Sequence, residues 1–189
     1  MTIPLKTVIT NLIQADEVLS HKLRIAEKPG LFRTTAMFFA HSGDSWFWAL
    51  GLAILWYFGN EQWKRWAFYE LAFICLLVVL IMSLKFTIRR KRPEGEWGAI
   101  YRNTDPHSFP SGHAARAFLI AVVCVILGPS WLALVLLIWA PLVTLSRVLM
   151  GVHYLSDVVV GALIGIIFAY FVWGFVYTLP LPLIILKGI

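Results

Sequence analysis

Two long stretches of the chain contain no charged side chain, and they constrain its fold more than any other feature. No Asp, Glu, Lys or Arg occurs between Arg116 and Arg147, or between Asp157 and Lys187. A helix needs about 20 predominantly apolar residues to cross a bilayer. Hydrophobic residues make up 60% of the 189 positions, which is more than a soluble domain carries. We therefore predict an all-α fold, a polytopic transmembrane helical bundle.

The N-terminal segment has a different pattern, in which apolar residues recur at helical spacing among polar and charged ones. Because charges occur throughout, the segment lacks the continuous apolar run of a signal peptide. We predict an amphipathic helix at the membrane interface within residues 1–30, ended by Pro29-Gly30. Its apolar positions are Leu5, Val8, Ile9, Leu12 and Ile13.

The remaining apolar runs predict about five spans. An apolar run from Thr34 is interrupted at 41–44, and we place the first span from Gly43 onward, with Asp44 near its end. The tail with Pro180 and Pro182 is expected at the interface. The chain is too short for a further soluble domain, so 1–189 is predicted to be one membrane-embedded domain. The other spans are expected at 66–85, 113–127, 131–149 and 156–177.

Five spans in this order bring distant polar residues to one membrane face. Each crossing reverses direction, so the loop before His113 and the turn after Leu149 lie on the same side. The start of the first span, with Asp44, lies there too. Ionisable groups at helix ends that share one face indicate a functional site. We therefore look for chemistry in residues 85–157.

Three cations in this region are suited to hold a phosphate. Lys85 and Arg92 are seven residues apart, nearly two helical turns, so both can point the same way until Pro93 bends the chain. Guanidinium groups bind phosphate oxygens in a bidentate way, and a lysine adds a point charge. We predict that Lys85, Arg92 and Arg147 form an anion clamp.

Two histidines complete the candidate site. His153 and Asp157 are four residues apart on one helical face, so the carboxylate can fix the tautomer and leave the other ring nitrogen as a nucleophile. His113 follows the turn 110–112 at a helix start, where free backbone N–H groups favour an anion. It can protonate a leaving oxygen from the opposite side of the phosphorus. This arrangement predicts in-line phosphoryl transfer.

These spacings resemble, with no departure, the three-part motif of the type 2 phosphatidic acid phosphatase (PAP2) superfamily. The matching segments are Lys85-x6-Arg92-Pro93, Pro110-Ser111-Gly112-His113 and Ser146-Arg147-x5-His153-x3-Asp157. The resemblance implies an integral membrane phosphatase that needs no metal and forms a phosphohistidine intermediate. It implies His153 as nucleophile, Asp157 as its orienting residue and His113 as the acid. The implied phosphate-binding residues are Lys85, Arg92, Ser111, Gly112 and Arg147.

The predicted substrate is a lipid phosphate or lipid diphosphate, because the site opens at the bilayer surface and the polar loop is too short for a soluble substrate domain. Phosphatidic acid, phosphatidylglycerophosphate and undecaprenyl diphosphate all fit the resemblance. A lipid phosphotransferase is the main alternative. A non-catalytic lipid-phosphate binding or transport protein and a vanadate-dependent haloperoxidase are further ones. We expect no metal, cofactor, nucleic acid or obligate protein partner.

Several cations lie outside the motif. Arg116 is one turn into a span, where an unpaired charge is costly, so we expect it to pair with Asp44 or to contact the substrate head group. Arg89, Arg90 and Lys91 are interpreted as topogenic or head-group-anchoring residues. Relatives of the family usually have six spans, one more than we predict.

Localisation is expected in the plasma (inner) membrane. Lysines and arginines gather on the side of the candidate site, which by the positive-inside rule would place that site in the cytoplasm. Bacterial relatives often face the opposite side. The sequence therefore predicts a multi-pass membrane protein and leaves the orientation of the site open.

Overall fold

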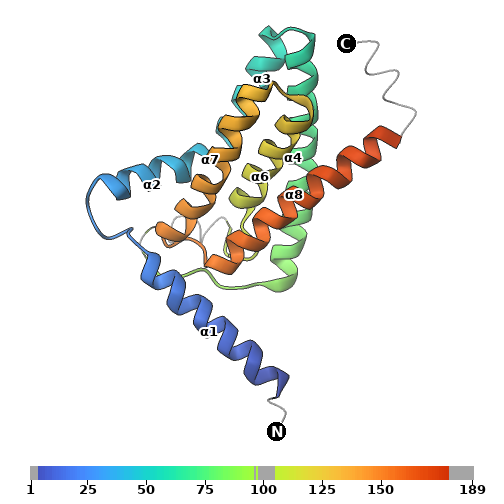
Figure 1. Ribbon diagram of the computed structural model, residues 1–189. Coiled ribbons are helices and arrows are strands. Elements are labelled where there is room, and N and C mark those ends of the chain that lie inside the picture. The colour runs from blue at the N-terminus through green and yellow to red at the C-terminus, as the bar shows by residue number, and fades with distance from the viewer. Residues whose placement is uncertain (1–3, 96, 98–104, 179–189) are drawn as a thin grey trace.

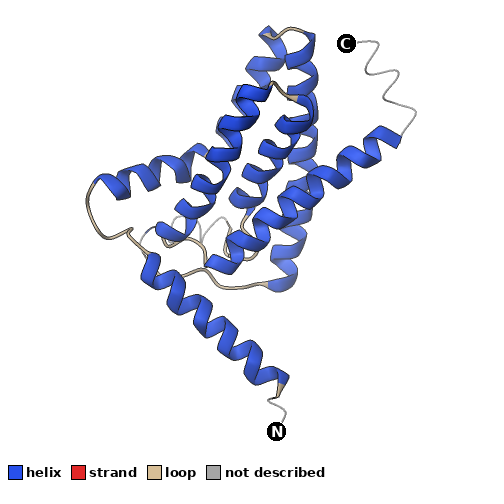
Figure 2. Cartoon of the chain, in the orientation of Figure 1, coloured by secondary structure: helices blue, strands red, loops and turns tan. Residues whose placement is uncertain are grey.

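The computed structural model describes residues 4–95, 97 and 105–178, and within these ranges the chain is helical (Figures 1 and 2). No strand occurs in the described ranges, apart from an isolated bridge between Lys91 and His107. The helices are α1 (Leu5–Leu23), α2 (Leu31–Ser42), α3 (Ser45–Phe58), α4 (Glu61–Ile88), α6 (Gly112–Leu127), α7 (Ser130–Leu149) and α8 (Leu155–Thr178).

Five of these helices coincide with the predicted spans. Helices α4, α7 and α8 are long and apolar enough to cross a membrane, and α3 and α6 are shorter apolar helices. Helix α4 begins before the predicted boundary because Asn60 caps it, with Oδ1 accepting from the Trp63 amide at 3.1 Å. The predicted helical membrane bundle is confirmed. The predicted interfacial tail lies outside the described residues.

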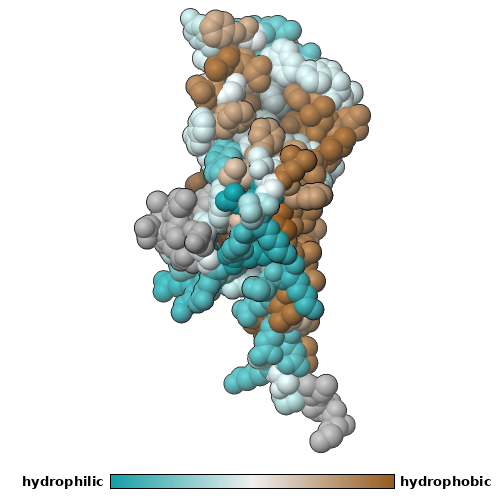
Figure 3. All heavy atoms as spheres, turned by 90° about the vertical axis from the view of Figure 1, so that its left-hand side faces the viewer, coloured by the Kyte–Doolittle hydropathy of each residue, from teal (hydrophilic) through white to brown (hydrophobic). Residues whose placement is uncertain are grey.

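The amphipathic N-terminal helix is present as α1, which projects from one end of the bundle (Figure 1). Its apolar positions remain exposed, from 39% for Val8 to 74% for Leu5. Hydrophilic side chains gather near the end of the bundle where α1 attaches, and hydrophobic ones cover much of the rest of the visible face (Figure 3). An exposed apolar stripe beside a polar zone suits a helix lying in the interface.

Helix α2 is a correction to the sequence analysis, which did not predict a helix before the first span. Residues 31–42 form a separate helix that packs on α7 and lies at an angle to α3 (Figure 1). Gly43 joins the two helices, and a Cβ there would lie 2.8 Å from Val143 Cγ1 of α7. The glycine therefore lets the α2–α3 junction approach α7 closely.

Helix α6 is the most enclosed element, packed between α7, α8 and α4. Its crossing with α8 depends on glycines: a Cβ at Gly161 would lie 2.5 Å from the Ser111 carbonyl oxygen, and one at Gly165 would meet the Ala115 carbonyl. Small residues at helix contacts allow such close backbone approach in membranes. As a result the first turn of α8 lies against the start of α6, where the Ser111 amide donates to the Asp157 carbonyl at 3.0 Å.

Candidate active site

Helix ends that carry the predicted site residues meet at the end of the bundle near α1. Helices α4 and α7 end there, and α6 and α8 begin there (Figure 1). The α2–α3 junction reaches the same place, where Asp44 contacts His113. The structure thus brings together the residues proposed from the sequence: Asp44, Lys85, Arg92, Ser111, Gly112, His113, Arg116, Arg147, His153 and Asp157.

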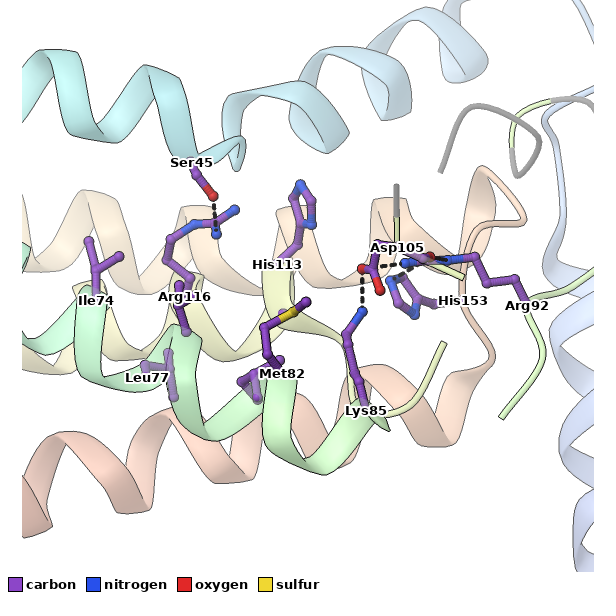
Figure 4. Close-up of a pocket in the computed structure, with 13 residues that line it drawn as sticks. Ser45, Ile74, Leu77, Met82, Lys85, Arg92, Asp105, His113, Arg116 and His153 are labelled. Carbon is purple, nitrogen blue, oxygen red and sulfur yellow. Dashed lines mark hydrogen bonds and ion pairs between the residues drawn. The ribbon is translucent and has the colours of Figure 1, made fainter. Parts of the chain in front are cut away.

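Lys85 and Arg92 converge on one carboxylate, that of Asp105 (Figure 4). Lys85 Nζ donates to Asp105 Oδ2 and also to the His107 carbonyl at 3.0 Å. Arg92 Nη2 donates to the same Asp105 oxygen at 2.7 Å. Both cations are buried. We call this pair the cationic cradle, because two buried cations aimed at one anionic oxygen form an anion-binding position.

Arg147 adds positive charge from the inner side of the site. Its side chain is buried, and Nη1 donates to the Ala40 carbonyl of α2 at 3.3 Å. Its charge acts on both Arg92 and His153. Helix α2, which the sequence analysis did not predict, therefore helps to hold the third residue of the predicted clamp.

His153 is held between a carboxylate and a guanidinium. Its Nδ1 faces Asp157 Oδ2 at 3.5 Å, and its Nε2 lies 3.2 Å from Arg92 Nη1. Burial, opposed by Asp157 and reinforced by the charges of Arg92 and Arg147, lowers the pKa of His153 to about 3. A proton on Nδ1 faces the carboxylate, and the Nε2 lone pair then remains available at neutral pH. Protonation would remove that lone pair only as the pH falls through about 3.

His113 has its own carboxylate partner, Asp44. The His113 Nε2 and Asp44 Oδ1 atoms are 2.8 Å apart. Asp44 also contacts His41 Nδ1 at 3.1 Å. A carboxylate at this distance stabilises the protonated imidazolium, which is the form that can donate a proton. The structure therefore places a His–Asp pair on each side of the site.

Ser111 and Gly112 shape the helix start beside His113. Ser111 is the N-cap of α6, and its fully buried side chain faces the Ala114 amide at 3.5 Å. Gly112 lines the cavity, and its first-turn position directs backbone N–H groups toward the site. This geometry agrees with the anion-binding turn expected from the sequence.

Arg116 contacts the neighbours of Asp44. Its Nη1 donates to Ser45 Oγ at 2.7 Å, and its Nη2 donates to the Gly43 carbonyl. Among the hydrogen bonds described for this side chain, none reaches the Asp44 carboxylate. The expected direct pair is therefore replaced by a clamp on the α2–α3 junction that carries Asp44. Because Arg116 also lines the cavity, the head-group alternative stays a prediction.

The site opens into a cavity of about 170 Å³ with two kinds of wall (Figure 4). One wall is polar and includes the cationic cradle, His113 and His153. The other is an apolar strip of α4. Such a cavity can take a charged group at one end and a hydrocarbon chain at the other. The apolar lining residues are Ile74, Leu77, Val78, Ile81 and Met82.

Two further residues of the site were missed by sequence reasoning. Asp105 lies in the polar loop, where its contact with the cradle has no local sequence signal. Arg90, interpreted as an anchor, instead donates from Nη1 to Asp157 Oδ1 at 2.8 Å, so that interpretation is wrong for Arg90. In the described ranges, no three His, Cys, Asp or Glu side chains are grouped as a metal site.

Comparisons with known proteins point to one family. A family model, the PAP2 superfamily, matches residues 66–180. The chain is 30% identical over 142 residues to a decaprenylphosphoryl-5-phosphoribose phosphatase of Mycobacterium tuberculosis, covering 75% of this chain and 78% of that protein. It is 35% identical over 94 residues to an undecaprenyl-diphosphatase of Sulfolobus acidocaldarius. That match covers 48% of this chain and only 45% of the relative's length.

The fold also resembles a solved structure. The crystal structure of a transmembrane PAP2 type phosphatidylglycerolphosphate phosphatase from Bacillus subtilis superposes with a TM-score of 0.71 at 26% identity. The superposition covers 89% of this chain and 88% of that one. The likeness therefore includes the arrangement of the helices and extends well beyond the three motifs.

Proposed function

Because this chain belongs to the PAP2 superfamily, we propose that it is an integral membrane phosphatase that hydrolyses a lipid phosphate or lipid diphosphate. One observation carries the proposal: His113, His153 and the cationic cradle line the same cavity as an apolar strip of α4. The cradle suits a phosphate, and the apolar strip suits a lipid tail. As in the sequence analysis, 1–189 is taken as one domain, in the plasma membrane.

The proposed reaction has two steps. First, the His153 Nε2 lone pair attacks phosphorus, the bond from phosphorus to the lipid oxygen breaks, and His113 gives a proton to that oxygen. Then His113 takes a proton from water, the water oxygen attacks phosphorus, and the phosphorus–nitrogen bond breaks to release phosphate. Asp157 orients His153, and the cations hold the oxygens that gain charge. No metal takes part in either step.

Asp105 is proposed to occupy the phosphate position in the empty enzyme. We expect Asp105→Asn to tighten inhibition by orthovanadate and by inorganic phosphate about 10-fold, because a neutral amide no longer competes for the cradle. Competitive inhibition constants measured against a lipid phosphate test this. Glu94→Gln, which removes an exposed carboxylate just beyond Arg92, should leave both constants unchanged. Weaker inhibition in Asp105→Asn would show that Asp105 instead holds the cradle in shape.

A substrate panel with purified protein in detergent and EDTA tests the proposed function. Release of phosphate from phosphatidic acid, phosphatidylglycerophosphate or undecaprenyl diphosphate is the expected result, and the relative kcat/KM values identify the substrate. Transfer of phosphate to an added alcohol without release would indicate a phosphotransferase. Binding without turnover would indicate a binding or transport protein. Bromide oxidation with vanadate and peroxide would indicate a haloperoxidase.

A further inference from the structure

A polar network connects the interfacial helix α1 to Asp157. Arg90 is its central residue: Nη1 donates to Asp157 Oδ1 at 2.8 Å and to Ser156 Oγ at 2.6 Å. The other terminal nitrogen, Nη2, donates to Asp16 Oδ2 of α1 at 2.8 Å. One guanidinium thus joins a carboxylate of α1 to a carboxylate of α8, which lie far apart in the sequence.

Helix α1 also caps the start of α8. The Ser156 amide donates to Asp16 Oδ1 at 3.0 Å, and the Leu155 amide donates to Ser20 Oγ at 2.8 Å. The first amides of a helix have no partner within it, and side-chain oxygens at this position stabilise the helix start. Two side chains of α1 therefore do for α8 what a local N-cap does for other helices.

The network determines which Asp157 oxygen faces His153. Oδ1 accepts from Arg90, whereas Oδ2 accepts from the Tyr154 amide at 2.9 Å and faces His153 Nδ1. The Asp157 side chain is 0% exposed, so water is not an alternative partner for it. Arg90 in turn stacks over the Tyr154 ring, 4.0 Å from its centroid. With both oxygens engaged, the carboxylate has one orientation.

Asp16 has the charge state that this role needs. Burial raises its pKa, but hydrogen bonds from Ser156 and Arg90 outweigh burial and hold the pKa of Asp16 below its usual value. The side chain is therefore ionised at neutral pH and balances the second half of the Arg90 guanidinium. A buried carboxylate such as Asp157 that loses its cationic partner is strongly destabilised.

We propose that Asp16 and Arg90 are positioning residues, through which helix α1 holds Asp157 in the orientation that His153 requires. This inference rests on the proposed function, in which His153 is the nucleophile. It makes α1 part of the catalytic unit as well as a membrane-surface helix. Neither residue touches the cavity lining, so both act through Asp157.

The test is a double-mutant cycle on purified protein in detergent. Asp16→Asn and Arg90→Gln should each lower kcat about 10-fold, the scale at which outer partners act on site residues. KM and the inhibition constant of orthovanadate should change less than about twofold, because the cradle is intact. The double variant should be no slower than Arg90→Gln, since both changes break one network. Additive losses would overturn the proposal.

Matched variants separate positioning from charge and from folding. Glu17→Gln and Lys91→Gln remove the same charges from exposed neighbours and should keep the wild-type kcat. Arg90→Lys keeps the charge but cannot bridge both carboxylates, so it should not restore kcat. Melting temperatures of all variants are measured in parallel. A kcat loss that only follows the melting temperature would show that the network is merely structural.

A second measurement needs no turnover. In protein with 15N-labelled histidine, the NMR signals of His153 report which ring nitrogen carries the proton. We expect Arg90→Gln and Asp16→Asn to change the His153 tautomer populations, and Lys91→Gln to leave them unchanged. An unchanged His153 signal in Arg90→Gln would overturn the inference. Absence of phosphate release from the wild type would overturn the proposed function, and the NMR result would still decide the network.

Discussion

His153→Ala is expected to lower the kcat of phosphate release about 10⁴- to 10⁶-fold, the loss seen when a nucleophile is removed from a site that otherwise remains whole. In the structure His153 is the residue whose Nε2 lies in the cationic site while a carboxylate faces its other nitrogen. The measurement is single-turnover and steady-state phosphate release from the best substrate of the panel. Orthovanadate binding should persist in the variant, since the cradle is unchanged.

The phosphohistidine is tested directly in the same experiment. Acid-labile, base-stable radiolabel should appear on the wild-type protein after rapid quenching with a lipid substrate labelled in its phosphate. It should be absent from His153→Ala. His21→Ala, which removes an exposed histidine of α1, is the control and should keep both label and turnover. Retained label or activity in His153→Ala would mean that another residue attacks.

His113→Ala is expected to lower kcat for a lipid phosphate about 10²- to 10⁴-fold, the usual contribution of a general acid. The loss depends on the leaving group. An aryl phosphate with an acidic phenol needs little protonation, so its first turnover should lose much less. Because the same histidine is proposed to activate water, the aryl phosphate should then show a burst of one phenol per enzyme before slow turnover.

Asp44 gives a matched check on this role. Asp44 Oδ1 contacts His113 Nε2 at 2.8 Å, so Asp44→Asn should show the same leaving-group dependence with a smaller loss. Equal losses for lipid and aryl phosphates, in either variant, would contradict a proton-donor role. They would indicate that His113 holds the phosphate without donating to the leaving group.

The two His–Asp pairs differ in what their carboxylates do. His153 is neutral at working pH, because burial outweighs the nearby Asp157 and lowers its pKa to about 3. His113 must carry a proton to act as an acid, and the Asp44 contact favours that form. Similar pairs can thus supply a nucleophile on one side of the phosphorus and an acid on the other.

Much of the fold follows from local sequence. Charge-free stretches of bilayer length predicted the helices that became α6, α7 and α8, because an apolar helix satisfies its own backbone hydrogen bonds in lipid. The alternation of crossings then predicted that Asp44 and His113 share one face, and their carboxylate–imidazole contact agrees with it. The spacing of His153 and Asp157 needed only helical geometry.

The outer part of the site was decided by tertiary packing. Helix α2 was not predicted, because its apolar run reads as the start of the following span until Gly43 allows the junction to pack on α7. Arg90 has the sequence context of a membrane anchor. It contacts Asp16, which is 74 positions away, only because α1 lies across the start of α8.

The sequence by itself therefore determined the membrane bundle and the motif residues, since both depend on local spacing and on the length of apolar runs. The tertiary structure alone decided what surrounds these residues: Asp105 in the cradle, Asp44 against His113, and the link from Asp16 through Arg90 to Asp157. These contacts join segments far apart in the chain, and a charged residue carries no local signal of the partner that packing will bring to it.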